Sequence, residues 1–201
     1  MKQLVIFGKG GFAGDIYAAI DKHKPNEHPV FMVDDEYYSP SERNTLPFSQ
    51  FDIENHEVLV AVADPEKRRA IVEKFPSNTT WGVWIDPGVN ILGLNVRISP
   101  GSILCAGTIL TRDIVIGKHA HLNLLTTIGH GCTVGDFFTT SPGVKVGGDC
   151  TIGDNVFIGS NAAIKEKIDI TENVYIGMLA GVTKNITEPG VYIGTPARKI
   201  K

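Results

Sequence analysis

The second half of the chain carries a hydrophobic pattern with a period of six residues. In steps of six from Leu92 to Val182, sixteen positions follow one another without an insertion, and only Thr140 is not Ile, Leu or Val. Glycine follows eight of these positions, at 93, 117, 129, 135, 147, 153, 159 and 177. An even spacing of aliphatic and β-branched residues is typical of strands, whereas a helix repeats every 3.6 residues.

A second register of small or β-branched residues lies two positions before the first and runs from Val96 to Ala180, with Phe138 as its exception. No charged residue falls on either register. Six-residue sides, three to a coil, predict a triangular parallel β-helix of about five coils in which both registers point inward and glycine helps the backbone to turn corners. A β-sandwich with coincidental spacing does not account for fifteen aliphatic matches. Cys132 and Cys150, one coil apart, are then buried reduced thiols that stack.

The first half alternates strand and helix patterns, which predicts a small parallel α/β domain. Asp64 is expected to cap the second helix, and Pro65 suits its first position. The expected strands are Gln3–Phe7, Val30–Val33, Glu57–Ala63 and a fourth near Trp81–Ile85; the helices run from the first glycine cluster to Ile20 and over 64–75, and 36–56 is a connecting loop. We expect residues 1–86 to form this domain, a half-Rossmann-like unit, and residues 87–201 the β-helix.

Composition narrows the function classes. The 201 residues carry a net charge of −3, so no basic excess points to a nucleic-acid partner. Three cysteines do not suggest a disulfide framework, and the sequence has no recognisable signal peptide, which favours the cytoplasm. No apolar run is long enough for a membrane span, and no Cys/His spacing is typical of a zinc site.

The candidate ligand site of the first half is a glycine cluster. Gly8, Gly10 and Gly11 follow the first strand where the next helix begins, a turn that can present backbone N–H groups to a phosphate. Asp34 or Asp35, after the second strand, could accept from a ribose hydroxyl or a nucleobase N–H. A tight turn without a ligand is the plain alternative. An NAD-dependent reductase is a third, weakened because the domain is half a dinucleotide fold and Ala13 replaces the third glycine of the fingerprint.

The repeat and the ending YIGTPARKI (192–200) resemble the hexapeptide-repeat acyltransferases. The resemblance implies a left-handed parallel β-helix, a homotrimer and acetyl-CoA as cosubstrate. Together with the opening VIFGKGGFAGDI, the chain is similar to bacterial nucleotide-sugar N-acetyltransferases and sialic-acid O-acetyltransferases. This implies acetyl transfer to the amino group of a 4-amino-4,6-dideoxy sugar linked to UDP or dTDP. O-acetylation of sialic acid or a related sugar is the alternative, and the pathway that uses the product stays open.

The resemblance also implies site residues. The segment N-x(6)-H matches Asn123 and His130, with His130 as the general base at a subunit interface and the amide of Gly148 serving acetyl-CoA. Further candidates for acetyl-CoA binding are Met178, Ala180, Lys184, Gly194, Pro196, Ala197 and Arg198. On the nucleotide side the candidates are Gly8, Gly10, Gly11, Asp34, Asp35 and Arg68, with Phe12 at the position near the sugar where many members have His.

General-base chemistry suits an imidazole, whose pKa of about 6.5 leaves it mostly neutral at pH 7 and whose positioned action is worth roughly 10²–10⁴-fold. Family members commonly place Asp or Glu directly after this histidine, but here Gly131 follows it. Asp113, Asp136, a neighbouring subunit or a backbone carbonyl is then expected to orient the ring. His119 and His121, on either side of an inward alanine, are expected to face out on the surface. If these two met His130, the β-helix could instead be a non-catalytic or metal-binding scaffold.

Overall fold

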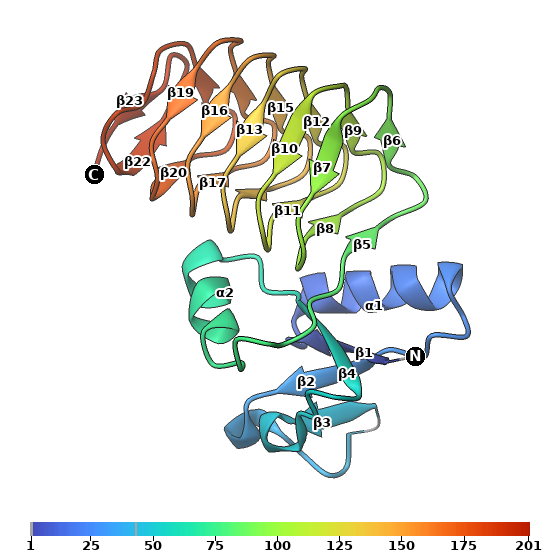
Figure 1. Cartoon of the computed structure of the whole chain (residues 1–201). Coiled ribbons are helices and arrows are strands. Elements are labelled where there is room, and N and C mark those ends of the chain that lie inside the picture. The colour runs from blue at the N-terminus through green and yellow to red at the C-terminus, as the bar shows by residue number, and fades with distance from the viewer. Residues whose placement is uncertain (1, 43) are drawn as a thin grey trace.

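A computed structural model of the chain describes residues 2–42 and 44–201. The N-terminal domain is a parallel sheet in the order β3-β2-β1-β4. Its elements are β1 (Gln3–Phe7), α1 (Gly11–His23), β2 (Val30–Val33), β3 (Thr45–Pro47), β4 (His56–Val60) and α2 (Pro65–Val72), with 3₁₀ turns at Asp35–Tyr37 and Phe48–Gln50. The Asp64 carboxylate caps α2 by accepting from the Lys67 N–H at 3.0 Å, as predicted. Helix α1 lies between this sheet and the β-helix (Figure 1).

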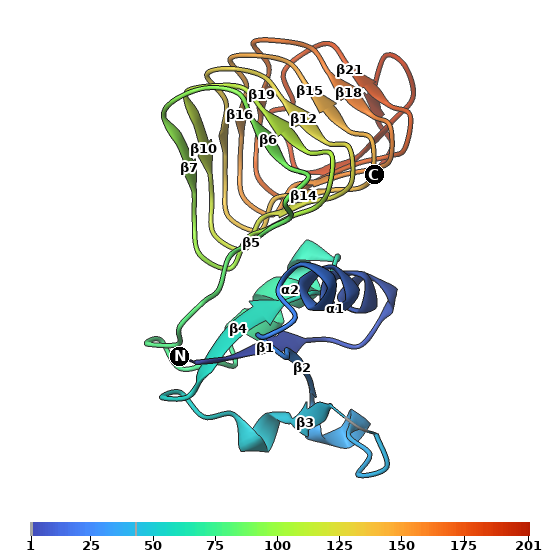
Figure 2. The same cartoon turned by 90° about the vertical axis from the view of Figure 1, so that its right-hand side faces the viewer.

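The rest of the chain winds into a β-helix whose triangular outline is visible in Figure 2. Its strands form three sheets, in the orders β23-β22-β20-β17-β14-β11-β8-β5, β21-β18-β15-β12-β9-β6 and β19-β16-β13-β10-β7. The strands are β5 (Trp84–Ile85), β6 (Asn90–Ile91), β7 (Val96–Ile98), β8 (Ile103–Leu104), β9 (Ile109–Leu110), β10 (Ile114–Ile116), β11 (His121–Leu122), β12 (Thr127–Ile128), β13 (Thr133–Val134), β14 (Thr139–Thr140), β15 (Lys145–Val146), β16 (Thr151–Ile152), β17 (Phe157–Ile158), β18 (Ala163–Ile164), β19 (Asp169–Ile170), β20 (Val174–Ile176), β21 (Gly181–Val182), β22 (Gly190–Ile193) and β23 (Arg198–Lys199).

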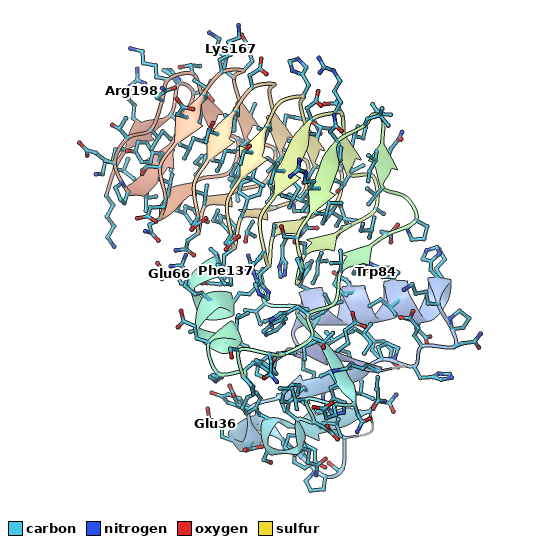
Figure 3. All side chains as sticks on the ribbon, in the orientation of Figure 1. Glu36, Glu66, Trp84, Phe137, Lys167 and Arg198 are labelled. Carbon is cyan, nitrogen blue, oxygen red and sulfur yellow. The ribbon has the colours of Figure 1, made fainter. Side chains whose placement is uncertain are left out.

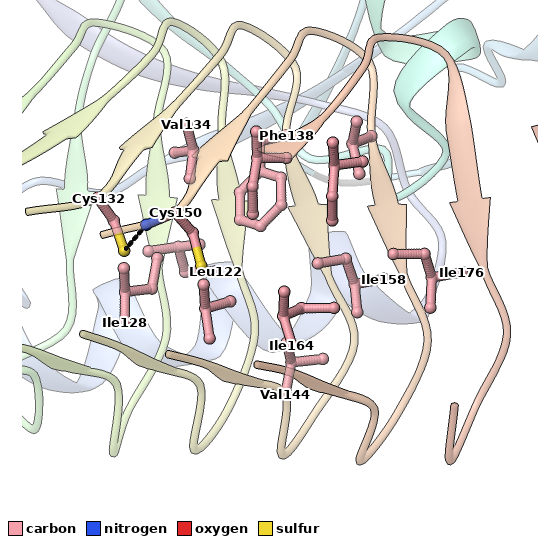
Figure 4. Close-up of a cluster of buried hydrophobic side chains, with 14 of the residues drawn as sticks. Leu122, Ile128, Cys132, Val134, Phe138, Val144, Cys150, Ile158, Ile164 and Ile176 are labelled. Carbon is pink, nitrogen blue, oxygen red and sulfur yellow. Dashed lines mark hydrogen bonds between the residues drawn. The ribbon is translucent and has the colours of Figure 1, made fainter. Parts of the chain in front are cut away.

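Both predicted registers line the inside of this β-helix from Leu104 onward (Figure 4). Thr140, the polar exception, is buried there and accepts from the Asn123 N–H at 3.0 Å, so its hydroxyl is satisfied. The Cys150 N–H donates to the Cys132 sulfur at 3.4 Å, which confirms the predicted stacking. Leu92 is the departure, 62 % exposed, because it lies on the first coil, where no earlier coil covers it.

Two predictions about the first half need correction. The strand expected near Trp81–Ile85 divides between the two sheets: Trp81 forms an isolated parallel bridge with Val58 of β4, whereas Trp84–Ile85 pairs in parallel with β8 and belongs to the β-helix. The fourth strand is Thr45–Pro47, which pairs with β2 inside the stretch that was expected to be a loop. That strand has three residues and includes a proline, so it carries no hydrophobic alternation that a sequence pattern could reveal.

Arg68 joins the two halves of the molecule. Its side chain is fully buried, and its five N–H groups donate to the carbonyls of Val62, Ala63, His119 and Phe137 and to the Thr139 hydroxyl. Arg68 was predicted on the nucleotide side, but every donor of its guanidinium is used by the protein itself. Desolvation lowers its pKa to about 9.

His119 and His121 were predicted to face solvent, and both are buried instead. They do point away from the β-helix interior, but the N-terminal domain covers that face. The His119 ring packs edge-on against Trp81 at 4.6 Å between ring centroids, and His121 lies 5.2 Å from Phe12 of α1. The sequence pattern fixed which way these side chains leave the coil, but it held no information on what covers them. Neither helix in the described parts of the chain is long and apolar enough to cross a membrane.

Candidate functional site

The β-helix has three corners, and His130 lies on the one farthest from the N-terminal domain. The other two corners carry Phe137, near α2, and Leu124, near α1. Successive coils pair residues 18 apart, as in Thr127 with Lys145, so a straight column forms along the third corner. We call this part of the β-helix the His130 corner; it consists of Arg112, His130, Gly148, Glu166 and Lys184 together with the residue that follows each of them. Lys167, which is one of these, marks the corner at the top edge of Figure 3.

The imidazole of His130 is half exposed and lies against the backbone of Gly148. A Cβ atom on Gly148 would meet the ring carbon Cε1 at 2.7 Å, so only glycine leaves room for the ring in this position. The N–H of Gly148 donates no hydrogen bond within the described residues, although its carbonyl accepts from Lys167. An accessible imidazole and a free backbone donor therefore lie on adjacent coils, the pair that proton transfer and oxyanion stabilisation require.

The predicted phosphate turn lies at the carboxyl end of β1. Gly8 has a φ of +113°, a region that favours glycine. Gly10 is the N-cap of α1 and Gly11 its first residue, and a Cβ on either would meet nothing within 4 Å. Because the first N–H groups of a helix have no partner within it, this open turn can receive an anion.

Asp34 and Asp35 lie at the same edge of the sheet, because β2 runs parallel to β1. The Asp34 carboxylate accepts from Lys74 at 2.8 Å, and that of Asp35 accepts from the Ser49 N–H and hydroxyl at 3.0 and 2.8 Å. The structure thus brings the glycine turn and both aspartates to one edge.

Phe12 and Asn123 meet at a groove of about 640 Å³ between α1 and the β-helix, with Asp15, Trp84 and Asp86 among its other lining residues. The Asn123 side chain accepts from the Leu124 N–H at 2.8 Å. Asn123 lies on the α1 side of the β-helix, whereas His130 lies on the opposite corner. A single chain therefore does not bring the two halves of the N-x(6)-H match together.

The residues predicted to bind acetyl-CoA divide into three groups. Lys184 continues the His130 corner three coils beyond His130, about 14 Å at ~4.8 Å per coil, and borders a small cleft with Ala197 and Arg198. Met178, 71 % exposed, lies on the same corner as Leu124, and Gly194 and Pro196 are exposed near the C-terminal end. Ala180 was predicted on the outer wall, but its side chain is buried inside the β-helix and cannot touch a ligand there.

The described residues contain no group of three or more His, Cys, Asp and Glu side chains placed to hold a metal ion. His119 and His121 are buried at the domain junction, and His130 lies on the far corner, so the three do not converge. Cys105 borders the groove, but burial, with Asp86 adding to it, raises the pKa of its thiol to about 12. A thiol with so high a pKa is a poor nucleophile.

Comparison with known proteins shows which proteins this chain resembles. The family model described as bacterial transferase hexapeptide (six repeats) matches residues 125–166 and 149–184. WeeI from Acinetobacter baumannii AYE has the same fold with a TM-score of 0.89 and 27 % identity over 100 % of both chains. Over residues 125–184 the chain therefore resembles the hexapeptide-repeat transferases. Its predicted fold class, a small parallel α/β domain followed by a left-handed β-helix, is thereby confirmed.

Two further comparisons extend this likeness. The acetyltransferase domain of PglB from Neisseria gonorrhoeae FA1090 superposes with a TM-score of 0.90 at 22 % identity over 100 % of both chains, and it has also been solved in complex with acetyl coenzyme A. GDP-perosamine N-acetyltransferase from Escherichia coli O157:H7 is 30 % identical over 86 residues, which make up 43 % of this chain and 39 % of that protein. The match thus spans about two fifths of the curated relative.

Sequence reasoning missed one residue of the His130 corner. The carboxylate Oδ1 of Asp149 lies 3.4 Å from His130 Nδ1, whereas Asp136, one of the expected partners, turns to another corner and accepts from the Lys118 N–H at 2.7 Å. The signal was present in the spacing, because Asp149 follows His130 by one coil and one residue. The expected partners Asp113 and Asp136 did not include a residue of this next coil.

Proposed function

We propose that this acyltransferase transfers the acetyl group of acetyl-CoA to the amino group of a nucleotide-linked 4-amino-4,6-dideoxy sugar. The observation that carries the proposal is the pairing of the half-exposed His130 imidazole with the unpaired Gly148 N–H on adjacent coils. The resemblance supports UDP or dTDP as the nucleotide, and the curated relative named for GDP-perosamine adds GDP to the candidates. The complex of the PglB domain with acetyl coenzyme A supports the choice of cosubstrate.

The reaction follows from the roles of these two groups. The sugar nitrogen attacks the thioester carbonyl and forms the C–N bond, and the Gly148 N–H stabilises the oxyanion that develops. His130 accepts the proton that the nitrogen loses. Collapse of the intermediate breaks the C–S bond, and the imidazolium returns the proton to the departing sulfur, so the products are an amide and CoA with its thiol.

We further propose that each active site spans two subunits of a homotrimer. The nucleotide edge with Gly10 belongs to the N-terminal domain and the groove with Phe12 and Asn123 borders it, whereas His130 lies on the far corner of the β-helix. A second copy is needed to bring a His130 corner against this groove. Lys184 and Arg198 then face the CoA phosphates. The Lys184 ammonium would bind a phosphate as a compact charge, and the planar Arg198 guanidinium could donate two hydrogen bonds to one phosphate. Reduced cysteines support a cytoplasmic enzyme.

A panel of acceptors tests the activity. Purified protein with acetyl-CoA is offered 4-amino-4,6-dideoxy sugars linked to UDP, dTDP or GDP, and sialic acid as the O-acetylation arm, and free CoA thiol is measured. We expect release with a nucleotide-linked amino sugar and its loss in His130→Ala at an unchanged sedimentation coefficient. Acetylation of sialic acid alone would favour the O-acetyltransferase alternative, and no release with any acceptor would reject the proposal.

Subunit mixing tests the shared site. His130→Ala and Gly10→Trp, which blocks the open turn, each inactivate a homotrimer if both halves are needed. Co-expressed with different affinity tags and purified as mixed trimers, the two variants restore part of the activity only when one site draws on two subunits. A mixed trimer without activity, from two variants that each fold, would place both halves within one chain.

A further inference from the structure

His130 has two carboxylate neighbours on its corner, one on each flanking coil. The Asp149 carboxylate approaches the ring at 3.4 Å, measured from Oδ1 to Nδ1, and the Asp149 N–H donates to the His130 carbonyl at 2.6 Å. On the other side, the Asp113 carboxylate accepts from Asn95 at 2.8 Å and pairs with Arg112 at 2.5 Å. Asp113 is therefore committed to its own coil and the one before it.

The carboxylate of Asp149 has no such commitment. Among the described residues it makes no other ion pair and no hydrogen bond through its oxygens, and its side chain is 48 % exposed against 52 % for His130. Its backbone is anchored to His130 itself, so the side chain cannot drift far from the ring. A distance of 3.4 Å is long for a hydrogen bond, and such contacts shorten when the substrate complex forms.

Gly131 makes this approach possible. A Cβ atom at position 131 would lie 2.3 Å from the Asp149 Oδ1, so any side chain there would push the carboxylate away. The φ of Gly131 is +69°, which also favours glycine. The absence of an acidic residue directly after His130 and the presence of one on the next coil are thus two parts of one arrangement. A carboxylate at position 131 and that of Asp149 would compete for the same space, and here Asp149 occupies it.

We propose that Asp149 is the positioning residue of the general base. Its carboxylate accepts the Nδ1–H of His130 and so fixes the tautomer in which Nε2 carries the lone pair that takes the proton of the sugar amine. When Nε2 has taken that proton, the same carboxylate stabilises the imidazolium until the proton passes to the departing thiolate. The inference rests on the proposed function of His130.

The ring is also held against rotation. The Gly148 backbone lies under it, and the charged residues on the same corner are Arg112 and Asp113 on the preceding coil, Asp149 on the next coil, and Glu166 with Lys167 on the coil after that. Of these, only Asp149 is within 4 Å of a ring nitrogen as a charge partner among the described residues. Packing sets the plane of the ring, and the carboxylate sets which nitrogen is protonated.

The test is Asp149→Asn with Asp113→Asn as its matched control. Both positions have a left-handed backbone, with φ of +57° and +55°, which asparagine tolerates, so neither variant strains the fold. We expect Asp149→Asn to lower kcat by roughly 10–100-fold, the usual cost of removing a partner that orients a functional histidine, with both KM values unchanged. Asp113→Asn should stay within about twofold. An equal loss in the two variants would mean a diffuse charge effect and overturn the proposal.

A spectroscopic readout separates this inference from the proposed function. In ¹⁵N NMR at pH 8, the His130 ring of the unaltered protein should show the Nδ1–H tautomer, and Asp149→Asn should shift it to a mixture or to Nε2–H. This measurement needs no substrate. A tautomer that is unchanged in Asp149→Asn rejects the positioning role, even if acetyl transfer by His130 is established.

Moving the carboxylate provides the rescue. Gly131→Asp alone places a side chain against Asp149 and should lower kcat, whereas Gly131→Asp combined with Asp149→Gly removes that clash and returns one carboxylate to the ring. We expect the double variant to recover at least tenfold over Asp149→Gly. A double variant no more active than Asp149→Gly would show that Asp149 acts through something other than its carboxylate.

Discussion

Replacing Arg68 by Met tests whether this buried cation joins the two halves of the molecule. Methionine keeps most of the apolar stem but cannot donate, so five hydrogen bonds are lost, and the carbonyls of Val62 and His119 lose the donor they have in the intact protein. At about 1 kcal/mol net for each bond the loss is about 5 kcal/mol. Removing a buried charge returns part of that, as the lowered pKa of Arg68, about 9, indicates. We expect a net destabilisation of about 3–5 kcal/mol, the usual cost of breaking a buried charged network.

The assay is thermal unfolding followed by circular dichroism and calorimetry. For a chain of this length, a loss of 3 kcal/mol lowers the melting temperature by roughly 6–12 °C. Because three of the lost bonds cross from α2 to the β-helix, at His119, Phe137 and Thr139, the N-terminal domain should also melt before the β-helix and split the calorimetric peak. The neighbouring Arg69→Met is the control. It removes a partly exposed guanidinium that lies 5.1 Å from the Phe137 ring, a contact worth about 1 kcal/mol or less.

A double-mutant cycle then isolates one cross-domain bond. Thr139→Val removes the hydroxyl that accepts from Arg68 at 2.6 Å, and its effect should largely disappear when Arg68 is already Met. The reasoning is refuted if Arg68→Met unfolds within 1 kcal/mol of the unaltered protein. If the Arg68→Met variant keeps its stability but loses affinity for the nucleotide sugar, Arg68 binds the nucleotide, as the sequence analysis predicted.

Three further predictions concern other positions. Burial, and to a smaller extent the charge of Arg68, lowers the pKa of His119 to about 4, against about 6.5 in the unfolded chain. The free energy of unfolding is therefore unaffected by this group above pH 6.5 and falls by about 2 kcal/mol at pH 5, because the unfolded chain then binds a proton that the folded one does not. Guanidinium unfolding between pH 7.5 and 5 should show a weaker pH dependence in His119→Phe. Lys167 has a φ of +59°, and Lys167→Asn should raise the free energy of unfolding by about 1 kcal/mol, visible as a higher urea midpoint; a lower midpoint would mean that the lysine makes up for its strain. Gly148→Ala keeps the backbone N–H but places a Cβ 2.7 Å from His130 Cε1, so it should displace the imidazole and lower kcat by roughly 10²-fold, while the melting temperature stays within a few degrees; full activity would show that the position of the ring against Gly148 is not needed.

The β-helix could be predicted almost completely from the sequence, because its contacts are fixed by spacing. Residue i lies against residue i+18, so a single period places every inward side chain, including Cys132 over Cys150 and the polar Thr140. The failure at Leu92 has the same origin, since a repeat contains no information about where stacking begins. The N-terminal sheet was harder to predict. Strand β3 has three residues and includes a proline, so it shows no hydrophobic alternation, and Trp84–Ile85 is apolar enough to suit either sheet.

Contacts between the two halves lay outside the reach of pattern reasoning. Nothing in the spacing of the β-helix says that the N-terminal domain covers β11, so His121 was read as exposed. Nor does helix periodicity distinguish an arginine that binds a ligand from one that binds carbonyls of another domain. Arg68 illustrates the difference, because its five donors find partners at residues 51 to 71 positions away as well as in its own domain.

The candidate site also has one part that sequence spacing predicts and one part that depends on contacts between domains. Its part on the His130 corner is a matter of spacing, and the missing carboxylate could have been found by asking which residues lie 18 or 19 positions from His130: Gly148 and Asp149. Its other part, the groove with Phe12 and Asn123, depends on how α1 docks against the β-helix, and its union with a His130 corner depends on a second subunit. In a β-helix of this kind, the residues that share one corner can therefore be derived from a single sequence, whereas the proposed acceptor site depends on contacts between domains and subunits that spacing does not predict.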